Sequence, residues 1–445
     1  MTTSFNTQTP TQKADETIRT ILQSQWDGVG ALRIDSPPGA GKTYIVELLA
    51  AQSLELLKER CMIATQTNAQ ALDLARRLAS GFGRLTIHLF CRDGLPLPDE
   101  LVALPNLCVI HQTQQLPSGP CVVIANGAKW SWVGDGVEPF DLQIVDEAFQ
   151  MPDFRFHQIA GLARRVVLIG DPGQIGPVIT CEIERWRDDP AGPHVPCPCA
   201  LLHRYPSVAH IRLPVSRRLP ADTVRFIQPA FYPEMAFEAL TGACERALLA
   251  GPSRGDGLDR AIDGAAKGHT LQLLTLPARV TGEMDEALTA SIVALIERLL
   301  SRGTRIIDRG VERKLTPEMI GVACAHVVQV SAVRERLGAA FDGLYVETSD
   351  RFQGLERPVM IVQHPLSGRA DADAFHLDAG RLCVMLSRHR NACFVLSRAG
   401  LLEMLTRHAP GGERILDIEE DTEYEGWKAH HALLSSLVAE GRVLV

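Results

Sequence analysis

The stretch that decides the fold is Ser36-Pro37-Pro38-Gly39-Ala40-Gly41-Lys42-Thr43. An apolar run, residues 31–34, precedes it and an amphipathic run, residues 44–57, follows it, which is the strand–loop–helix order of a phosphate-binding loop. The two glycines let successive backbone N–H groups converge on one concavity, and the helix N-terminus adds the positive end of its dipole. The sequence therefore predicts a nucleotide phosphate site, although Ser36 stands where the pattern G-x-x-x-x-G-K-[ST] has glycine.

Lys42 and Thr43 end this loop, and each has a predicted task. The ammonium group of Lys42 is placed to reach the β- and γ-phosphates of ATP, and the hydroxyl group of Thr43 is placed to hold Mg²⁺. The backbone of Gly39, Ala40 and Gly41 is expected to bind phosphate oxygens. The alternative interpretation is a Gly/Pro turn that Lys-Thr follows by chance.

Two adjacent carboxylates, Asp146 and Glu147, follow the strand-like residues 140–145. Asp146 is suited to binding Mg²⁺ through water, and Glu147 is suited to accepting a proton from an attacking water molecule. A solvated turn would also place two carboxylates at the end of a strand. The phosphate-binding loop upstream favours the catalytic interpretation.

Several amide and hydroxyl side chains also follow or precede predicted elements. Thr67 and Asn68 come after a strand-like run, residues 61–65, and are placed to donate hydrogen bonds to phosphates, although Asn68 can equally cap the next helix. Gln174, after a strand ending near residue 170, either senses the γ-phosphate or faces solvent. Gln12, about two dozen residues before the loop, either grips the adenine edge or begins a helix in solvent.

The composition limits the class of protein. The chain has 445 residues, 46% of them hydrophobic, and no run of about 18 apolar residues that predicts a transmembrane helix. Residues 1–11 are polar and do not resemble a signal peptide. Eleven scattered cysteines favour reduced thiols and a cytoplasmic location. The net charge of −8 excludes general attraction to nucleic acid but allows a local basic groove.

Alternating strand-like and helix-like runs predict an α/β fold with doubly wound parallel sheets. Four segments are expected: a flexible tail (1–11), a first domain (12–212), a second domain (213–400) and an acidic and helical tail (401–445). Two stretches are read as loops, residues 181–212 and residues 251–268. The first contains His194, Cys197, Cys199 and His203. Their spacing is unlike a zinc site, so no zinc is expected.

The order of these motifs resembles that of a superfamily-one helicase, and most closely the branch of the nonsense-mediated mRNA decay helicase. Gln12 resembles the glutamine motif, residues 36–43 motif I, and Thr67-Asn68 motif Ia. The sequence DEAFQ at 146–150 is similar to motif II, and GDPGQ at 170–174 is similar to motif III. Residues 213–219, 352–356 and 381–390 are similar to motifs IV, V and VI. The likeness runs from Gln12 to about Leu396, with Ser216-Arg217 in place of the family's usual Gln-Tyr and no room for an inserted β-barrel.

This resemblance implies two RecA-like P-loop NTPase domains with ATP and Mg²⁺ in the cleft between them. It also implies that Arg218 and Arg388 act on the γ-phosphate, where such an arginine is worth roughly 10³–10⁵ in rate, and that Glu356 contacts the nucleotide. Thr348 and Ser349, with Thr67 and Asn68, are expected to contact single-stranded DNA or RNA through its phosphates. A polarity of 5′-to-3′ is implied by the branch alone.

Three functions fit these motifs. The first is an ATP-dependent nucleic-acid motor, a minimal core in which translocation is better supported than duplex separation. The second is a nucleotide-switched subunit that clamps nucleic acid or a protein without unwinding. The third, phosphoryl transfer to a small molecule, is disfavoured by the late arginine motifs. The sequence leaves the first two open.

Overall fold

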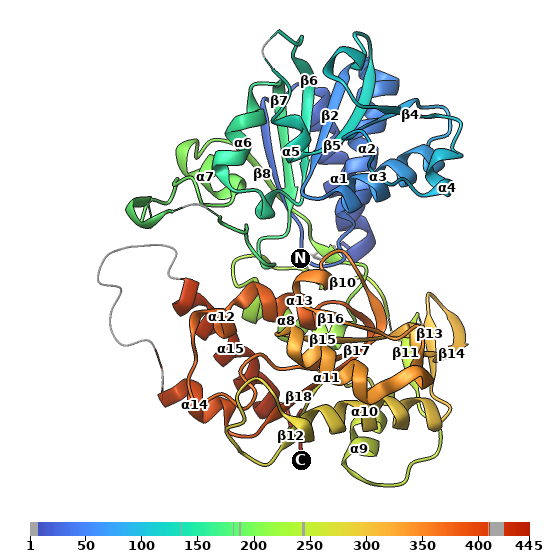
Figure 1. The fold of residues 1–445 in the computed structure, drawn as a ribbon, viewed down its shortest axis with the longest axis vertical. Helices are drawn as coiled ribbons and strands as arrows, with labels where there is room; N and C mark the ends of the chain where they lie inside the picture. The colour runs from blue at the N-terminus through green and yellow to red at the C-terminus, as the bar shows by residue number, and fades with distance from the viewer. Residues whose placement is uncertain are drawn as a thin grey trace, which may run out of the picture. The chain divides into compact units, whose positions relative to one another are not determined.

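The computed structural model describes residues 8–134, 136–180, 182–186, 188–242, 245–407, 409 and 422–445. The chain divides into two compact α/β units (Figure 1). The first unit extends to Pro214. The second begins at Val215 and also includes Gly173–Ile175 from a loop of the first half. The predicted N-terminal tail lies outside the described residues as far as residue 7, and the predicted acidic run lies outside them as far as residue 421.

In the described part of the chain, the first unit is built on an eight-stranded sheet with the order β4-β3-β5-β2-β6-β7-β1-β8. All of its neighbouring strands are parallel. The strands are β1 (Ala31–Asp35), β2 (Arg60–Thr65), β3 (Ile87–Phe90), β4 (Leu107–Ile110), β5 (Cys121–Asn126), β6 (Phe140–Asp146), β7 (Ala163–Gly170) and β8 (Ala209–Arg212). The α-helices are α1 (Pro10–Trp26), α2 (Lys42–Gln52), α3 (Asn68–Gly81), α4 (Asp99–Val102), α5 (Gly127–Trp130), α6 (Asp153–Ala160) and α7 (Cys197–Arg204).

Strand β2 shows why this sheet needs helices on both faces. All six of its residues are buried, and the four central ones, residues 61–64, are apolar on both sides of the sheet. Cys61 and Ile63 pack into a core cluster with residues of α1, α2 and α3, whereas Met62 and Ala64 pack into a second cluster with residues of α5, α6 and α7. Successive side chains thus enter opposite cores, as the two-residue period of a strand requires.

Two elements of the first unit contradict the loop predicted for residues 181–212. Helix α7 begins at Cys197, and strand β8 pairs in parallel with β1. The prolines around Cys197 suggested an irregular segment, but Pro198 lies in the first turn of the helix, where a missing N–H has no intrahelical partner to lose. Cys197 is fully buried there, and its Sγ atom lies 3.4 Å from the carbonyl oxygen of Ala148.

The second unit has a parallel sheet whose described strands follow the order β16-β15-β17-β18-β12-β19, with a separate antiparallel sheet, β11-β13-β14. The strands are β9 (Val215–Ser216), β10 (Glu238–Ala239), β11 (Arg246–Leu249), β12 (Leu271–Leu276), β13 (Arg305–Asp308), β14 (Val311–Lys314), β15 (Ile320–Cys324), β16 (Tyr345–Thr348), β17 (Arg357–Gln363), β18 (His389–Arg398) and β19 (Val443–Leu444). The α-helices are α8 (Ala221–Phe231), α9 (Gly257–Ala266), α10 (Glu286–Ser301), α11 (Val327–Leu337), α12 (Ala374–Leu377), α13 (Ala379–Leu386), α14 (Leu401–Arg407) and α15 (Thr422–Ala439).

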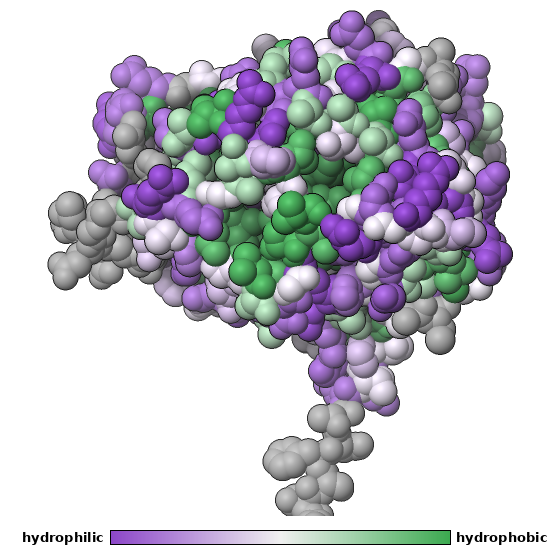
Figure 2. All heavy atoms as spheres, turned by 90° about the horizontal axis from the view of Figure 1, so that it is seen from below, coloured by the Kyte–Doolittle hydropathy of each residue, from purple (hydrophilic) through white to green (hydrophobic). Residues whose placement is uncertain are grey.

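Each unit is therefore a parallel sheet covered by helices, and the prediction of two RecA-like α/β domains is confirmed. In β17, Met360 and Val362 pack into one core cluster, and Val359 and Ile361 pack into another. Of the helices in the described ranges, none combines the length and the apolar character needed to cross a membrane. Figure 2 shows apolar side chains gathered around a hollow in one face of the second unit, with hydrophilic side chains at its margin.

Helix α9 contradicts the loop predicted for residues 251–268. The Asp256 carboxylate caps its N-terminus by accepting a hydrogen bond from the backbone N–H of Asp259. The helix buries Ala261, Ile262 and Ala265, whose spacing is helical. The glycines and charged residues of this stretch hid that short pattern in the sequence.

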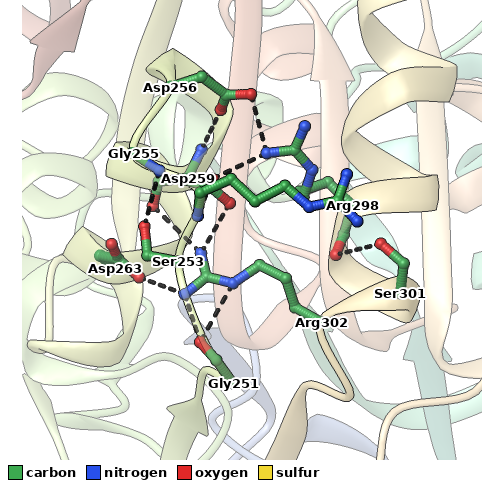
Figure 3. Close-up of polar contacts among 10 residues, drawn as sticks. Gly251, Ser253, Gly255, Asp256, Asp259, Asp263, Arg298, Ser301 and Arg302 are labelled. Carbon is green, nitrogen blue, oxygen red and sulfur yellow. Dashed lines mark hydrogen bonds and ion pairs between the residues drawn. The ribbon is translucent and has the colours of Figure 1, made fainter.

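A buried network of ion pairs holds α9 against α10 (Figure 3). Asp259 is fully buried and pairs with both arginines of α10, with Arg298 Nη1 at 2.8 Å and Arg302 Nη1 at 3.1 Å. Arg298 also pairs with Asp256, and Arg302 pairs with Asp263. The guanidinium group of Arg302 further donates to the carbonyl oxygen of Gly251, which ties the preceding loop to the same helix.

We expect Asp259→Asn to lower the midpoint temperature of unfolding, because it replaces the buried carboxylate that both arginines share with a neutral amide. The matched control is Ser301→Ala, which removes only an exposed hydrogen bond to the carbonyl oxygen of Arg298. Thermal unfolding followed by circular dichroism measures both variants. Equal midpoints for wild type and Asp259→Asn would show that the network contributes nothing to stability.

Two histidines are buried without charge partners where α15 covers the end of β17. His364 and His430 make an edge-on ring contact with centroids 5.2 Å apart. In the described part of the chain, neither ring nitrogen of His430 has a hydrogen-bond partner, and His364 Nδ1 accepts from the N–H of Leu366. Burial lowers the pKa of His364 to about 3 and lowers the pKa of His430 well below its ordinary value, with the neighbouring His376 of α12 adding to the effect on His430.

Stability should therefore fall as the pH falls. In the unfolded chain these histidines bind protons near pH 6.5, whereas in the native state they stay neutral to a much lower pH. The unfolding free energy is thus highest above pH 6.5 and decreases toward pH 4. His430→Phe should flatten this dependence, and the exposed His203→Phe should not. Thermal unfolding between pH 7.5 and pH 5 measures the slopes, and parallel slopes for all three proteins would contradict the assignment.

Candidate functional site

The phosphate-binding loop of the first unit has the backbone that its sequence requires. Gly39 and Gly41 have φ angles of 71° and 98°, which favour glycine, and α2 begins directly after Gly41. Ser36 is fully buried, and its N–H donates to the carbonyl oxygen of Gly170 at 2.8 Å. This bond continues the pairing of β1 with β7 by one residue. Because the position extends a strand, a serine is accommodated where the motif pattern has glycine.

The two predicted acidic residues and the loop lysine lie together at the carboxyl edge of this sheet. Lys42 Nζ is 3.1 Å from Glu147 Oε2. The backbone N–H of Glu147 donates to Asp146 Oδ1 at 2.9 Å. Glu147 has a φ of 52°, the left-handed region that non-glycine residues rarely occupy. Such strain collects at functional sites, where surrounding structure holds a side chain in a required position.

The group of Lys42, Asp146 and Glu147 holds more acidic than basic side chains. Burial, and after it the negative charge of Glu147, raise the pKa of Asp146 to about 7, while Lys42 opposes both effects. Two carboxylates thus share one ammonium group. Such a site suits a divalent cation, and Thr43, in the first turn of α2, supplies a hydroxyl oxygen from the same loop. The residues present therefore fit Mg²⁺ and nucleotide phosphates.

Thr67 and Asn68 lie at the end of β2, between the ends of β5 and β6. The hydroxyl group of Thr67 caps α3 by accepting from the N–H of Gln70. Asn68 Oδ1 accepts from Asn126 Nδ2 at 2.7 Å, so the strands β2 and β5 carry a pair of linked amides at their ends. Sequence reasoning missed Asn126, although it follows a predicted strand just as Asn68 does.

The neighbouring Gln66 links this amide pair to the acidic group. Its Nε2 atom donates to the backbone carbonyl oxygen of Asp146 at 3.2 Å. Gln12, by contrast, is exposed in the first turn of α1, where its side chain closes a capping box with Thr9. This geometry matches the helix-start alternative for Gln12, and its contact with adenine stays a prediction.

Gln174 belongs to the second unit rather than to the strand that precedes it. Ile175 is buried in the core of that unit, and the backbone of Gln174 packs so closely on Gly380 that a Cβ atom there would lie 2.6 Å away. Glycine at position 380 of α13 is thus required by the loop. A sensor role for Gln174 stays a prediction.

In the second unit, the predicted residues Arg218 and Glu356 form an ion pair. Arg218 Nε is 2.6 Å from Glu356 Oε2, and Arg390 Nη1 is 2.9 Å from Glu356 Oε1. Arg390 also pairs with Asp308 at 3.1 Å, and Asp308 lies 3.8 Å from Arg246. Although burial raises the pKa of Glu356, the two arginines lower it to about 2. This charged chain holds three arginines and two acids, so it carries one surplus positive charge.

Sequence reasoning missed Arg246, Asp308 and Arg390 as members of this chain. Arg246 and Asp308 belong to the antiparallel sheet β11-β13-β14, which has no signal in the sequence beyond short apolar runs. Arg388, expected to act on the γ-phosphate, is 2% exposed, and its Nε atom donates to the carbonyl oxygen of Val384.

The two remaining predicted nucleic-acid residues differ in accessibility. Thr348 ends β16 and is half-buried. Ser349 is fully buried, and its hydroxyl group accepts from Arg381 Nη1 at 2.9 Å. As it stands, Ser349 offers no exposed donor to a phosphate, and the prediction did not foresee its partner because Arg381 is 32 residues away in the sequence.

His194, Cys197, Cys199 and His203 form no metal cluster in the structure. Across the described residues, no group of three or more His, Cys, Asp or Glu side chains is arranged to hold a metal ion.

Two segments match family models that are each described as an AAA domain: residues 10–185 and residues 283–400. No curated protein sequence matches the chain. Among solved structures the chain is similar to PRRSV helicase, at 16% identity and a TM-score of 0.44, over 88% of this chain and 56% of that one. It is similar to arterivirus nonstructural protein 10 (helicase) in complex with DNA, at 16% identity and a TM-score of 0.43, over 87% and 64%. It is also similar to Bacteroides sp Pif1 with ADP-AlF4, at 13% identity and a TM-score of 0.42, over 86% and 92%. The chain thus spans less than two thirds of the arterivirus helicases.

We expect Glu356→Gln to destabilise the second unit by on the order of 2 kcal/mol, because two charge-assisted hydrogen bonds lose their acceptor charge and solvent screens part of the effect. The contribution of Glu356 is present above its unfolded pKa, near 4.3, and is lost as the pH falls toward 2. Urea unfolding at pH 7 and pH 3.5 measures it. Glu312→Gln, in an exposed pair with Arg305, is the control and should change little. A loss no greater than the control's contradicts the prediction.

Proposed function

We propose that this protein is an ATP-dependent nucleic-acid motor of the superfamily-one helicase type. The observation that carries the proposal is the group of Lys42, Asp146 and Glu147 at the carboxyl edge of the first sheet, with Gln66 joining Asp146 to the strand end that bears Thr67 and Asn68. The carboxylates of the phosphate site and the hydrogen-bond donors for a nucleic-acid strand thus lie at the ends of two neighbouring β-strands, β6 and β2, on one edge of the sheet. The two AAA-domain matches support a nucleotide-driven enzyme.

Each residue of the nucleotide group has a separate chemical task in this proposal. The backbone of Gly39, Ala40 and Gly41 binds phosphate oxygens, and Lys42 neutralises their charge. Glu147 accepts the proton of the attacking water, and its pairing with Lys42 holds the carboxylate beside the phosphate-binding loop. Thr43 and Asp146 would hold Mg²⁺, which supplies Lewis-acid stabilisation of phosphate charge when bound.

The second unit supplies positive charge in this proposal. Arg218, at the end of the charged chain, and Arg388 stabilise the γ-phosphate, and Gln174 senses it. Glu356 both orients Arg218 and contacts the nucleotide. A conformational change in this unit then couples hydrolysis to movement along single-stranded DNA or RNA. The polarity is 5′-to-3′, as the resemblance to the branch of the nonsense-mediated mRNA decay helicase implies. The nine described cysteines are free thiols, which favours a cytoplasmic location.

The second candidate is a nucleotide-switched clamp that binds nucleic acid or a partner protein without unwinding. The burial of Arg388 favours it, because an arginine that is 2% exposed needs a rearrangement before it can meet a phosphate. Both candidates use the same nucleotide site, so they differ only in whether bound strands accelerate hydrolysis and whether duplexes are separated.

ATP turnover with and without single-stranded DNA and RNA tests the proposal. We expect strands to raise the rate of the wild type. Lys42→Ala should lose ATP binding, whereas Glu147→Gln should keep it and lose turnover by at least about 100-fold, since only the proton acceptor is removed. Glu100→Gln, exposed on α4, is the control and should behave as wild type. Normal turnover by Glu147→Gln would overturn the base assignment, and a rate that no strand changes would replace the motor by the clamp.

A further inference from the structure

Trp132 is an exposed aromatic side chain at the carboxyl edge of the first sheet. It is 83% exposed, more than any other aromatic side chain that the structure describes as exposed. It lies six residues after Asn126, the last residue of β5, and two residues after the end of the one-turn helix α5. An indole ring left in water at this place carries a cost that a binding partner would remove.

The backbone beneath Trp132 is held firmly. Trp130, two residues earlier, is fully buried, and its indole N–H donates to the carbonyl oxygen of Ile63 at 2.9 Å. Its ring packs against Phe90 and Phe140. The N–H of Trp132 then donates to the carbonyl oxygen of Lys129, which fixes the turn. The exposed ring is therefore carried on a firmly held stretch of backbone.

The groups beside this stretch of backbone are hydrogen-bond donors and a cation. Asn126 Oδ1 accepts from the backbone N–H of Lys129, and Asn126 Nδ2 donates to Asn68 Oδ1. Within the described ranges, the amide nitrogen of Asn68 makes no hydrogen bond, so its two N–H groups end this chain of amides. The ammonium group of Lys129 donates to the carbonyl oxygen of His111 and adds a positive charge to the same edge.

We propose that Trp132 is a stacking platform for one base of a bound single-stranded nucleic acid. The proposal rests on the proposed function and names one residue of its binding site. Asn68 and Lys129 meet the phosphate backbone of the strand, and the adjacent base lies on the indole ring. Because every base has a π-face, such a platform binds single strands with little sequence preference.

A base fits this surface better than a protein partner does. A single exposed ring flanked by amide donors and a lysine offers a flat apolar face beside groups that bind phosphates, which is the composition of single-strand sites. A protein interface would instead require a contiguous apolar area around the ring. The described residues around the ring leave it 83% exposed.

The test compares the binding of two fluorescent oligonucleotides of about 12 nucleotides, an oligothymidylate and its abasic counterpart with the same phosphates. We expect Trp132→Ala to weaken oligothymidylate binding by about 5- to 150-fold and to change abasic binding by less than about twofold. Trp132→Phe should retain most of the affinity. The slope of log affinity against log salt should be unchanged, because no phosphate contact is lost. Trp186→Ala, which removes another exposed tryptophan of the first unit, is the matched control and should bind as wild type.

Three results overturn the platform. One is unchanged oligothymidylate binding by Trp132→Ala, and another is an equal loss for both oligonucleotides. The third is a loss of self-association or of protein binding with no effect on either strand, which would make the ring a protein contact. Failure of the wild type to bind either oligonucleotide refutes the proposed function itself and the platform with it. The unfolding temperature of each variant excludes misfolding as the cause.

Discussion

The contact on which the first unit depends joins Lys42 to Glu147, because it bridges two strand ends that are not neighbours. In the sheet, β7 lies between β1 and β6, so the loop after β1 and the acidic pair after β6 are about 10 Å apart. The long lysine side chain spans that gap. The chain after Glu147 must cross the end of β7, and Gly170 allows this, since a Cβ atom there would lie 2.8 Å from the ring of Phe149 and 2.9 Å from the backbone nitrogen of Ala148. Gly170, at the end of the strand next to β1, is thus part of the same arrangement.

The two units use buried charge in different ways. At the nucleotide group of the first unit, two carboxylates share one ammonium group, and the pKa of Asp146 is raised by burial and then by the negative charge of Glu147. In the second unit, the network around Asp259 is satisfied and fixes a helix pair, while the chain that runs from Arg246 to Arg218 has one surplus arginine. A negative surplus suits a divalent cation, and a positive surplus suits a phosphate. Phosphoryl transfer uses both a divalent cation and positively charged side chains.

The sequence predicted the elements and site residues that depend on neighbouring residues in the chain. The strand, loop and helix around Lys42 follow from hydrophobic period and glycine positions, and the acidic pair follows from its place after an apolar run. The sequence did not predict contacts made at long range. Ser349 is buried because Arg381 reaches it, Gln174 joins the second unit because Gly380 leaves room for it, and the small sheet that holds Asp308 has strands of only four residues. Helix α9 was missed because its capping aspartate and glycines resemble a loop when read one residue at a time.

Strand β2 gives the strongest reason to link nucleic acid to the nucleotide site. It lies between β5, which ends in Asn126, and β6, which ends in Asp146. The residues that follow it carry both connections: Gln66 donates to the carbonyl oxygen of Asp146, and Asn68 accepts from Asn126. Gln66 and Asn68 flank Thr67 in the sequence. Because β2 is buried along its whole length, the end of this strand cannot shift without moving both Asp146 and Asn126. A nucleic-acid strand that pulls on Asn68 therefore acts on the backbone of Asp146, the residue proposed to hold Mg²⁺. It acts through one hydrogen bond, with no further structural element between them.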